Sequence, residues 1–305
     1  MSRVLIFGAS GFLGRHVSGT LAPEATLIRP PRSDCDLVKV TLPQLADLIR
    51  TARPTAVVNC TGRVGGTDHE MVQAHTLVTA KLIEAIGLAA PRARLVRIGS
   101  AAEYGPTPAG HPVRETDPVD PVDGYGLSHL TATGLVELAV RSGRLDGVVL
   151  RVFNAVGPGL SGASLLGRAA RLIATALMRG LDTVVVDPLS AYRDLVDVRD
   201  VALAVRAAVR RPLLTVPVLN IGSGNAVQVR EAVRALAAVA GFSGTLTEAG
   251  AGGPSARTVR MPWSCADVSL AGSELGWAPS YDLNDTVKAL YRDVDGTAEV
   301  SLPKK

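Results

Sequence analysis

The sequence predicts an α/β fold built on a doubly wound parallel β-sheet, with a smaller lobe in its C-terminal half. Short segments that are apolar at every position alternate with longer segments whose apolar residues recur at helical spacing. This alternation is typical of strands that helices bury on both faces. The chain of 305 residues, 47% hydrophobic and 20% charged, is also long enough to bury one large core or two smaller ones.

The elements are expected to begin with a strand, a glycine-rich turn and a helix. The first strand covers 3–7 and ends at Gly8, and the following helix places Leu13, Val17 and Leu21 on one face. Further strands are expected at 26–28, 56–59, 95–98, 148–152, 183–186 and 216–221, and further helices at 42–52, 71–87 and 125–141. The segments 105–124 and 250–256 are rich in glycine or proline and are expected to be loops.

Composition argues against several classes of protein. The net charge of +4 arises from basic residues spread along the chain, which favours a small anionic ligand over nucleic acid. No stretch reaches the roughly 18 apolar residues of a membrane span, and the start of the chain lacks the features of a signal peptide, so we expect a cytoplasmic protein. Cys35, Cys60 and Cys265 are far apart, and the five histidines form no ligand motif, so neither a disulfide framework nor a metal site is expected.

Three glycines directly follow the first strand. Gly8, Gly11 and Gly14 form a G-x-x-G-x-x-G pattern. The first permits a tight turn, the second lets the backbone approach a pyrophosphate at a helix N-terminus, and the third allows close packing of helix and strand. A plain strand-to-helix turn is the alternative. The position of the pattern between a strand and an amphipathic helix predicts a dinucleotide-binding domain of the Rossmann type.

The end of the second strand indicates which dinucleotide binds. An acidic residue there would bond the ribose 2′-hydroxyl of NAD, but the segment 27–33 contains no carboxylate. It contains Arg29 and Arg32, whose planar guanidinium groups match the oxygens of a 2′-phosphate. Two solvated loop arginines are the alternative. The sequence therefore favours NADP(H) as the cofactor, with NAD as the alternative.

Further motifs, taken in order, resemble the extended short-chain dehydrogenase/reductases, also called NAD-dependent epimerase/dehydratases. The resemblance covers nearly the whole chain. Beyond the glycine loop it rests on the segments 36–37, 59–62, 99–105, 151–159, 192–202, 219–224 and 275–279. The resemblance implies contacts to the cofactor from the glycine loop, the end of the second strand, the loop after the third strand, the helix at 125–141 and the residue that follows the strand at 148–152. These residues are Gly8, Ser10, Gly11, Phe12, Leu13, Arg29, Arg32, Asp36, Leu37, Cys60, Thr61, Gly62, Tyr125, His129 and Phe153.

The resemblance also implies that a serine and a Tyr-x-x-x-Lys motif carry the chemistry. By motif position the serine is Ser100 and the tyrosine is Tyr125, while His129 replaces the lysine. Side chains 125 and 129 share one helix face, one turn apart. The family lysine binds the nicotinamide ribose and lowers the pKa of the tyrosine by its charge, whereas a histidine with a pKa of about 6.5 is mostly neutral.

This replacement favours reduction over oxidation. Oxidising an alcohol needs a phenolate as base, whereas reducing a ketone needs a proton donor, which neutral Tyr125 already is. Two alternatives stay open: His129 performs the role of the lysine unchanged, or the triad is vestigial and the proton comes from elsewhere. Ala101 and Ala102 are substrate-facing positions where the family's dehydratases have an Asp-Glu pair, and methyl groups cannot transfer protons. Glu103 is one position late.

Other positions of the resemblance concern the substrate. Asn154 and Arg193 match residues that contact a nucleotide-sugar diphosphate, although Arg193 could equally pair with a neighbouring aspartate. Arg257 and Arg260 lie near a further phosphate-binding position, and His75 stands where asparagine is usual.

The predicted function is that of an NADPH-dependent ketoreductase of secondary metabolism. The substrate is expected to be a nucleotide-bound keto-sugar or a polycyclic polyketide, because the altered triad is also similar to atypical actinomycete ketoreductases of antibiotic biosynthesis. A nucleotide-sugar epimerase with tightly bound NAD and a non-catalytic dinucleotide sensor are the alternatives.

Two lobes are expected. Residues 1–153 form the dinucleotide-binding Rossmann domain, 183–221 return to its sheet, and 154–182 and 222–298 form the substrate-binding lobe. The resemblance also allows a homodimer through the helix at 125–141.

Overall fold

The computed structural model describes residues 2–249 and 261–300, with side chains described up to residue 295. Its strands are β1 (Ser2–Phe7), β2 (Ala25–Ile28), β3 (Ala56–Asn59), β4 (Arg94–Ser100), β5 (Gly147–Val152), β6 (Asn154–Val156), β7 (Thr183–Val186), β8 (Tyr192–Asp197), β9 (Val218–Ile221), β10 (Ala226–Gln228) and β11 (Thr245–Glu248). Its helices are α1 (Phe12–Leu21), α2 (Leu42–Ala52), α3 (Asp68–Met71), α4 (Val78–Ala89), α5 (Gly124–Arg141), α6 (Leu165–Arg179), α7 (Val198–Arg210), α8 (Val229–Ala240), α10 (Ser269–Leu275) and α11 (Leu283–Val300).

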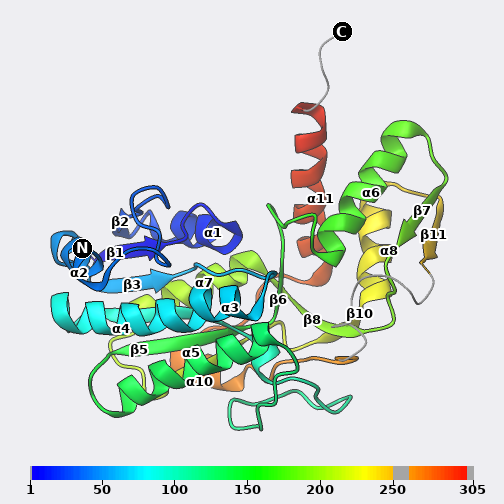
Figure 1. Cartoon of the computed structure of the whole chain (residues 1–305). Coiled ribbons are helices and arrows are strands. Elements are labelled where there is room, and N and C mark those ends of the chain that lie inside the picture. The colour runs from blue at the N-terminus through cyan, green and yellow to red at the C-terminus, as the bar shows by residue number, and fades with distance from the viewer. Residues whose placement is uncertain (1, 250–260, 301–305) are drawn as a thin grey trace.

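A six-stranded parallel sheet forms the centre of the larger lobe, with the strand order β2-β1-β3-β4-β5-β9 (Figure 1). Helices α1, α7 and α10 cover one face, and α2, α4 and α5 cover the other. This arrangement confirms the predicted doubly wound α/β fold. Because β2 and β3 pair with opposite edges of β1, the strand order reverses there, and a crevice is expected at the carboxyl ends of β1 and β3.

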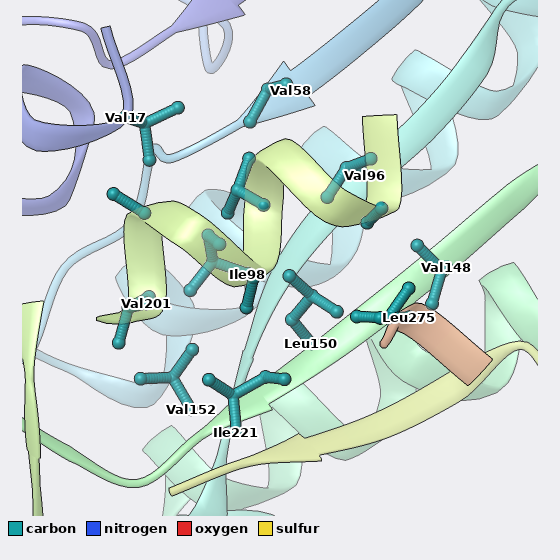
Figure 2. Close-up of a cluster of buried hydrophobic side chains, with 14 of the residues drawn as sticks. Val17, Val58, Val96, Ile98, Val148, Leu150, Val152, Val201, Ile221 and Leu275 are labelled. Atoms are coloured by element: carbon teal, nitrogen blue, oxygen red, sulfur yellow. The ribbon is translucent and has the colours of Figure 1, made fainter. Parts of the chain in front are cut away.

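The core beneath α7 explains why that segment is helical. Val198, Val201, Val205 and Ala208 recur at helical spacing and are all buried. Figure 2 shows aliphatic side chains of the sheet packed beneath this helix, with Leu275 of α10 closing the cluster. The strands of the main sheet are apolar at nearly every position because helices cover both faces of the sheet.

The smaller lobe contains two short sheets, with the orders β10-β8-β6 and β11-β7, and helices α6, α8 and α11 (Figure 1). The expectation that 183–221 returns to the main sheet is wrong at its start, because β7 pairs with β11 instead. The return begins with α7 and β9. The exposure of β7 alternates along the strand, which is typical of a strand covered on one face, whereas its apolar sequence predicted burial on both.

Two expected segments differ in detail from the structure. The helix expected at 71–87 consists of α3, a π-helical segment Val72–Leu77 and α4, and the π-helical segment carries His75. The expected loop at 105–124 has no helix or strand before α5 except a bridge between Val113 and Ala266. The expected loop at 250–256 lies outside the described residues. Over the described ranges, every helix is too short or too polar to cross a bilayer.

Candidate active site

A cavity of about 1010 Å³ opens at the carboxyl ends of β1 and β3, where the strand order reverses. Its size suits a cofactor. Its lining contains most of the residues that the resemblance assigned to the cofactor: Gly8, Ser10, Gly11, Arg29, Arg32, Asp36, Leu37, Cys60, Thr61 and Gly62. We call this space the dinucleotide groove.

The glycine loop has the geometry that its sequence predicted. Gly8 has a φ of +77°, and a Cβ at this residue would lie 2.9 Å from backbone atoms of Cys60 and Thr61. A Cβ at Gly14 would lie 1.9 Å from the carbonyl oxygen of Gly8, so α1 packs directly onto the loop. Gly11 caps α1 without a side-chain hydrogen bond. The backbone therefore reaches the groove with no side chain in the way.

A lysine that sequence reasoning overlooked supports the floor of the groove. Lys81 of α4 donates hydrogen bonds from Nζ to the carbonyl oxygens of Leu37, Val38 and Val40, at 2.9, 3.3 and 2.6 Å. These bonds tie the loop after β2 to a helix of the core. No local sequence pattern predicts that Lys81 binds these carbonyl groups, because the acceptors are backbone atoms more than 40 positions away in the chain.

The two arginines predicted to contact a 2′-phosphate both lie at the rim of the groove. Arg29 is exposed. Arg32 is 83% exposed and donates from Nε to Asp36 Oδ2 at 3.1 Å. Asp36 also accepts the backbone N–H of Val38, so this carboxylate orders the loop as well as pairing with Arg32. The exposed guanidinium groups are accessible to a phosphate, which would share Arg32 with Asp36.

The start of α5 brings the proposed proton donor to the end of β4. Asp123 caps the helix by accepting the backbone N–H of Gly126 at 2.8 Å. A Cβ at Gly126 would lie 2.5 Å from the carbonyl oxygen of Ala102, so only glycine lets the first turn of α5 approach the turn after Ser100 so closely. Tyr125 sits in this first turn, half-buried, with its ring centroid 4.6 Å from that of His129.

His75 joins the groove to α5. Its ring lies 4.0 Å from the His129 ring and edge-on to Tyr125 at 5.5 Å, between centroids. Its Nε2 accepts the backbone N–H of Arg63, and its Nδ1 lies 2.8 Å from Ser128 Oγ. Burial, and secondarily the charge of Arg97, lower the pKa of His75 to about 4, so it is neutral at physiological pH. From the sequence, this residue stood out only as a departure from the usual asparagine.

Arg97 lies behind the Tyr125–His129 pair and was missed by sequence reasoning. It is only 2% exposed, and its guanidinium donates to Thr79 Oγ1 at 3.0 Å, to Thr133 Oγ1 at 3.5 Å and to His129 Nδ1 at 3.2 Å. Burial lowers the pKa of Arg97 to about 10, so it remains charged near neutral pH. A signal was present: an arginine interrupts the apolar strand predicted at 95–98.

The turn after Ser100 buries the carboxylate of Glu103. Glu103 is fully buried, pairs with Arg151 Nε at 2.8 Å, and accepts the backbone N–H of Ser100 at 3.1 Å. Ser100 Oγ accepts the backbone N–H of Ala102 at 3.2 Å. Glu103 therefore orders the turn that carries Ser100, and it does not replace the missing acid-base pair of a dehydratase.

Other predicted residues lie apart from the groove lining. Phe12 and Leu13 form the first turn of α1, where the Phe12 ring contacts the His16 ring edge-on. Phe153 is buried beside Tyr104, with ring centroids 6.4 Å apart, in a small hydrophobic cluster.

Two of the predicted substrate residues, Asn154 and Arg193, lie in the smaller lobe on neighbouring strands, whereas Ala101 and Ala102 follow β4 of the main sheet. Asn154 of β6 pairs in register with Leu195 of β8, two residues after Arg193. Asn154 donates from Nδ2 to the carbonyl oxygen of Asp194, and Arg193 donates to the carbonyl oxygen of Tyr192. The Asp194 side chain accepts backbone N–H groups of residues 223, 224 and 266, so it is not the partner of Arg193.

The remaining expectations concern two arginines and the absence of a metal site. Arg257 and Arg260 lie outside the described residues. Within the part of the chain that the structure covers, no three His, Cys, Asp or Glu side chains gather where they could share a metal ion.

Comparisons with known proteins agree with this geometry. The model of the NAD dependent epimerase/dehydratase family matches residues 4–222. A dTDP-6-deoxy-L-talose 4-dehydrogenase (NAD(P)(+)) from Kitasatospora kifunensis is 36% identical over 304 residues, which cover 95% of this chain and 95% of that protein. A GDP-6-deoxy-D-mannose reductase from Pseudomonas aeruginosa is 28% identical over 305 residues, covering 95% and 96%.

The fold also matches solved structures. The structure of RMD from Pseudomonas aeruginosa complexed with NADPH superposes with a TM-score of 0.85 at 24% identity, over 97% of this chain and 100% of that one. This likeness establishes a shared fold.

Proposed function

Because the chain belongs to the NAD-dependent epimerase/dehydratase family, we propose that it is an NADPH-dependent reductase of a nucleotide-bound keto-sugar. The curated relatives support this substrate class, since both act on a 6-deoxy sugar attached to a nucleoside diphosphate. The observation that carries the choice of reaction is the turn after Ser100. It offers methyl groups at Ala101 and Ala102 and commits Glu103 to Arg151, so it retains groups for reduction but none for elimination.

The dinucleotide groove fits the cofactor by its own geometry. The positive φ of Gly8 and the absence of a side chain at Gly11 leave the backbone open to a pyrophosphate at the start of α1, while Gly14 lets α1 pack onto the loop. Arg29 and Arg32 at the rim suit a 2′-phosphate, which favours NADP(H) over NAD. When bound, the cofactor supplies the hydride.

The residues of this chain would then perform three tasks. The Ser100 hydroxyl hydrogen-bonds the carbonyl oxygen of the substrate and so stabilises the negative charge that develops there. The Tyr125 hydroxyl donates the proton that completes the alcohol. His129 keeps the Tyr125 ring in place and offers a hydrogen bond to a ribose hydroxyl.

The smaller lobe would bind the nucleotide part of the substrate. Arg193 and Asn154 lie on adjacent strands, and burial lowers the pKa of Arg193. Within the described residues, the Arg193 guanidinium donates its hydrogen bond to the carbonyl oxygen of the adjacent Tyr192. It could therefore also bind a diphosphate.

A homodimer would extend this proposal to the assembly. Leu127 and Leu138 of α5 are each 55% exposed, and Leu88 of α4 is 65% exposed. These leucines suit a helical interface with a second copy. Light scattering on the wild type and on the Leu138→Glu variant tests this, because a dimer should weaken with the charged side chain whereas a monomer should be unaffected.

The function is tested by cofactor identity and then by turnover. Cofactor released from the purified protein is identified, and the emptied protein is titrated with NADPH and NADH. NADPH consumption is then followed with a dTDP-linked 4-keto-6-deoxy sugar, with the free sugar, and with a polycyclic aromatic ketone. We expect tighter binding of NADPH and turnover of the nucleotide sugar alone.

Each other outcome contradicts the proposal in a distinct way. Firmly retained NAD with no net consumption of NADPH would indicate an epimerase. Turnover of the aromatic ketone alone would move the function to polyketides. Binding of NADPH without turnover of any ketone would indicate a dinucleotide sensor. The Tyr125→Phe variant is the matched control, and its kcat should fall by about 10²–10⁴.

A further inference from the structure

A buried positive charge lies directly behind the Tyr125–His129 pair. Alternation along β4 turns Leu95, Arg97 and Gly99 to the sheet face that α4 and α5 cover, while Ser100 ends the same strand. Arg97 is thus delivered by the strand that also carries the proposed catalytic serine. Its three side-chain acceptors, from Thr79, Thr133 and His129, are uncharged groups on two helices.

The contact with His129 determines the protonation of that ring. A guanidinium has donors and no acceptor, so the Nδ1 atom of His129 must present its lone pair to Arg97. The proton of the neutral ring then lies on Nε2. Protonating His129 would place an N–H against an N–H of Arg97, so Arg97 opposes a positive charge on His129.

His75 is held neutral in a similar way. Its Nε2 accepts from the backbone N–H of Arg63, which leaves the proton on Nδ1 to face Ser128 Oγ, and that hydroxyl in turn donates to the carbonyl oxygen of Tyr125. Both imidazoles beside Tyr125 are therefore neutral. Neither therefore supplies a positive charge to stabilise the phenolate that Tyr125 becomes when it gives up its proton.

Within the described part of the chain, Arg97 is a cation placed beside this pair that can perform this task. Among the charged groups that act on Arg97, Glu103 is paired with Arg151 and accepts the backbone N–H of Ser100, so this carboxylate is already engaged. Burial lowers the pKa of Arg97, while the negative charges of Glu103 and of ionised Tyr125 act in the opposite direction. The attraction between Arg97 and the Tyr125 phenolate is mutual, so Arg97 also favours ionisation of Tyr125.

We propose that Arg97 is a positioning residue of the proton-transfer site: it supplies from β4 the positive charge that the Tyr-x-x-x-His motif lacks, and it holds His129 as the neutral ring with its proton on Nε2. This inference rests on the proposed function for the direction of proton transfer, but its physical content concerns Tyr125 and His129 alone. It also explains why a charged side chain interrupts a buried apolar strand, where an aliphatic residue would be easier to bury.

Titration of Tyr125 tests the proposal without any substrate. Phenolate absorbance is recorded against pH for the wild type and the Tyr125→Phe variant, and the difference isolates Tyr125 from the other four tyrosines. The same difference is measured in the Arg97→Met background. We expect the Tyr125 midpoint to rise by about one unit or more when Arg97 is replaced, and to recover in part with Arg97→Lys. An unchanged midpoint would overturn the proposal.

A matched control is available on the same strand. Arg94 is also buried, but it pairs with Asp146 and with carbonyl oxygens near the end of α7, away from α5. Arg94→Gln should leave the Tyr125 midpoint unchanged. An equal rise with Arg94→Gln would mean that loosening of the fold, rather than loss of the Arg97 charge, shifts Tyr125, and would contradict the proposal.

The tautomer provides a test on the unaltered protein, should Arg97→Met fail to fold. Nitrogen NMR on labelled histidine, with the His129 signals assigned by their loss in His129→Asn, should show Nδ1 unprotonated and no titration between about pH 5.5 and 8. A protonated His129 at neutral pH would overturn the proposal. If keto-sugars are not turned over but the Tyr125 midpoint still depends on Arg97, the proposed function fails while this inference stands.

Discussion

Replacing Gly14 by alanine should weaken NADPH binding, because the new methyl group has no space. Its Cβ would lie 1.9 Å from the Gly8 carbonyl oxygen, 2.7 Å from the Gly8 carbonyl carbon and 2.8 Å from Ala9 Cα. All three are backbone atoms of the glycine loop, so relief requires moving the loop itself. Overpacking of this kind costs about 1–3 kcal/mol, and a similar loss in binding corresponds to an affinity roughly 5- to 150-fold lower.

Gly19 in the same helix is the matched control. Nothing lies within 4 Å of a Cβ built there, and the residue is exposed. Gly19→Ala should therefore gain up to about 1 kcal/mol from helix propensity and leave NADPH binding unchanged. In a chain of 305 residues that gain raises Tm by about 1.5 °C.

The assay is a fluorescence titration with NADPH, combined with thermal denaturation in the presence and absence of NADPH. Gly14→Ala should have a higher Kd for NADPH than Gly19→Ala, and NADPH should raise its Tm by less. If Gly14→Ala bound NADPH as tightly as the wild type, the loop would not be the pyrophosphate site, and the geometric argument would be refuted.

Three further predictions concern charges. Changing Arg29 and Arg32 together to alanine should raise the Kd for NADPH at least about tenfold and leave the Kd for NADH nearly unchanged. Parallel titrations with the two cofactors measure this. An equal loss of affinity for both cofactors would contradict a 2′-phosphate contact. Glu103→Gln should leave the buried guanidinium of Arg151 uncompensated and lower the free energy of unfolding by about 3–5 kcal/mol in urea denaturation, whereas a loss below 1 kcal/mol would mean that the pair is dispensable. The pKa of His75 is about 4 in the folded state and about 6.5 in the unfolded state. Between these pH values the unfolded state binds a proton at His75 and the folded state does not. The free energy of unfolding should therefore fall by about 3 kcal/mol as the pH drops from 6.5 to 4, and His75→Asn should remove that part of the dependence.

Local sequence was sufficient for the main sheet and the glycine loop. Strand, glycine pattern and helix follow one another without interruption at Gly8, Gly11 and Gly14, so the turn itself depends on near neighbours, although the close approach of Cys60 and Thr61 to Gly8 does not. The same holds for Tyr125 and His129, whose spacing on one helix brings their rings together. Predictions of this kind succeed because the interacting atoms are close in the chain.

The partners of the supporting residues could not be predicted, for the opposite reason, although Arg97 stands out in the sequence as a charge within an apolar strand. Lys81 acts on carbonyl groups of Leu37 and Val40, and Arg97 acts on His129, and neither pairing has a pattern in the chain because each depends on how distant elements pack. The sheet to which β7 belongs was likewise undetermined. An apolar run shows that a strand is buried, but not which neighbour it pairs with.

The interleaving of the two lobes has a consequence for how the chain folds. β5 belongs to the main sheet, the chain then builds β6, α6, β7 and β8 in the smaller lobe, and only afterwards does β9 complete the main sheet beside β5. Trp277, just after α10, still later donates its indole N–H to the carbonyl oxygen of Asp200 on α7. During synthesis, neither lobe can therefore finish before the other has begun, and the two should acquire their stable structure together rather than one after the other.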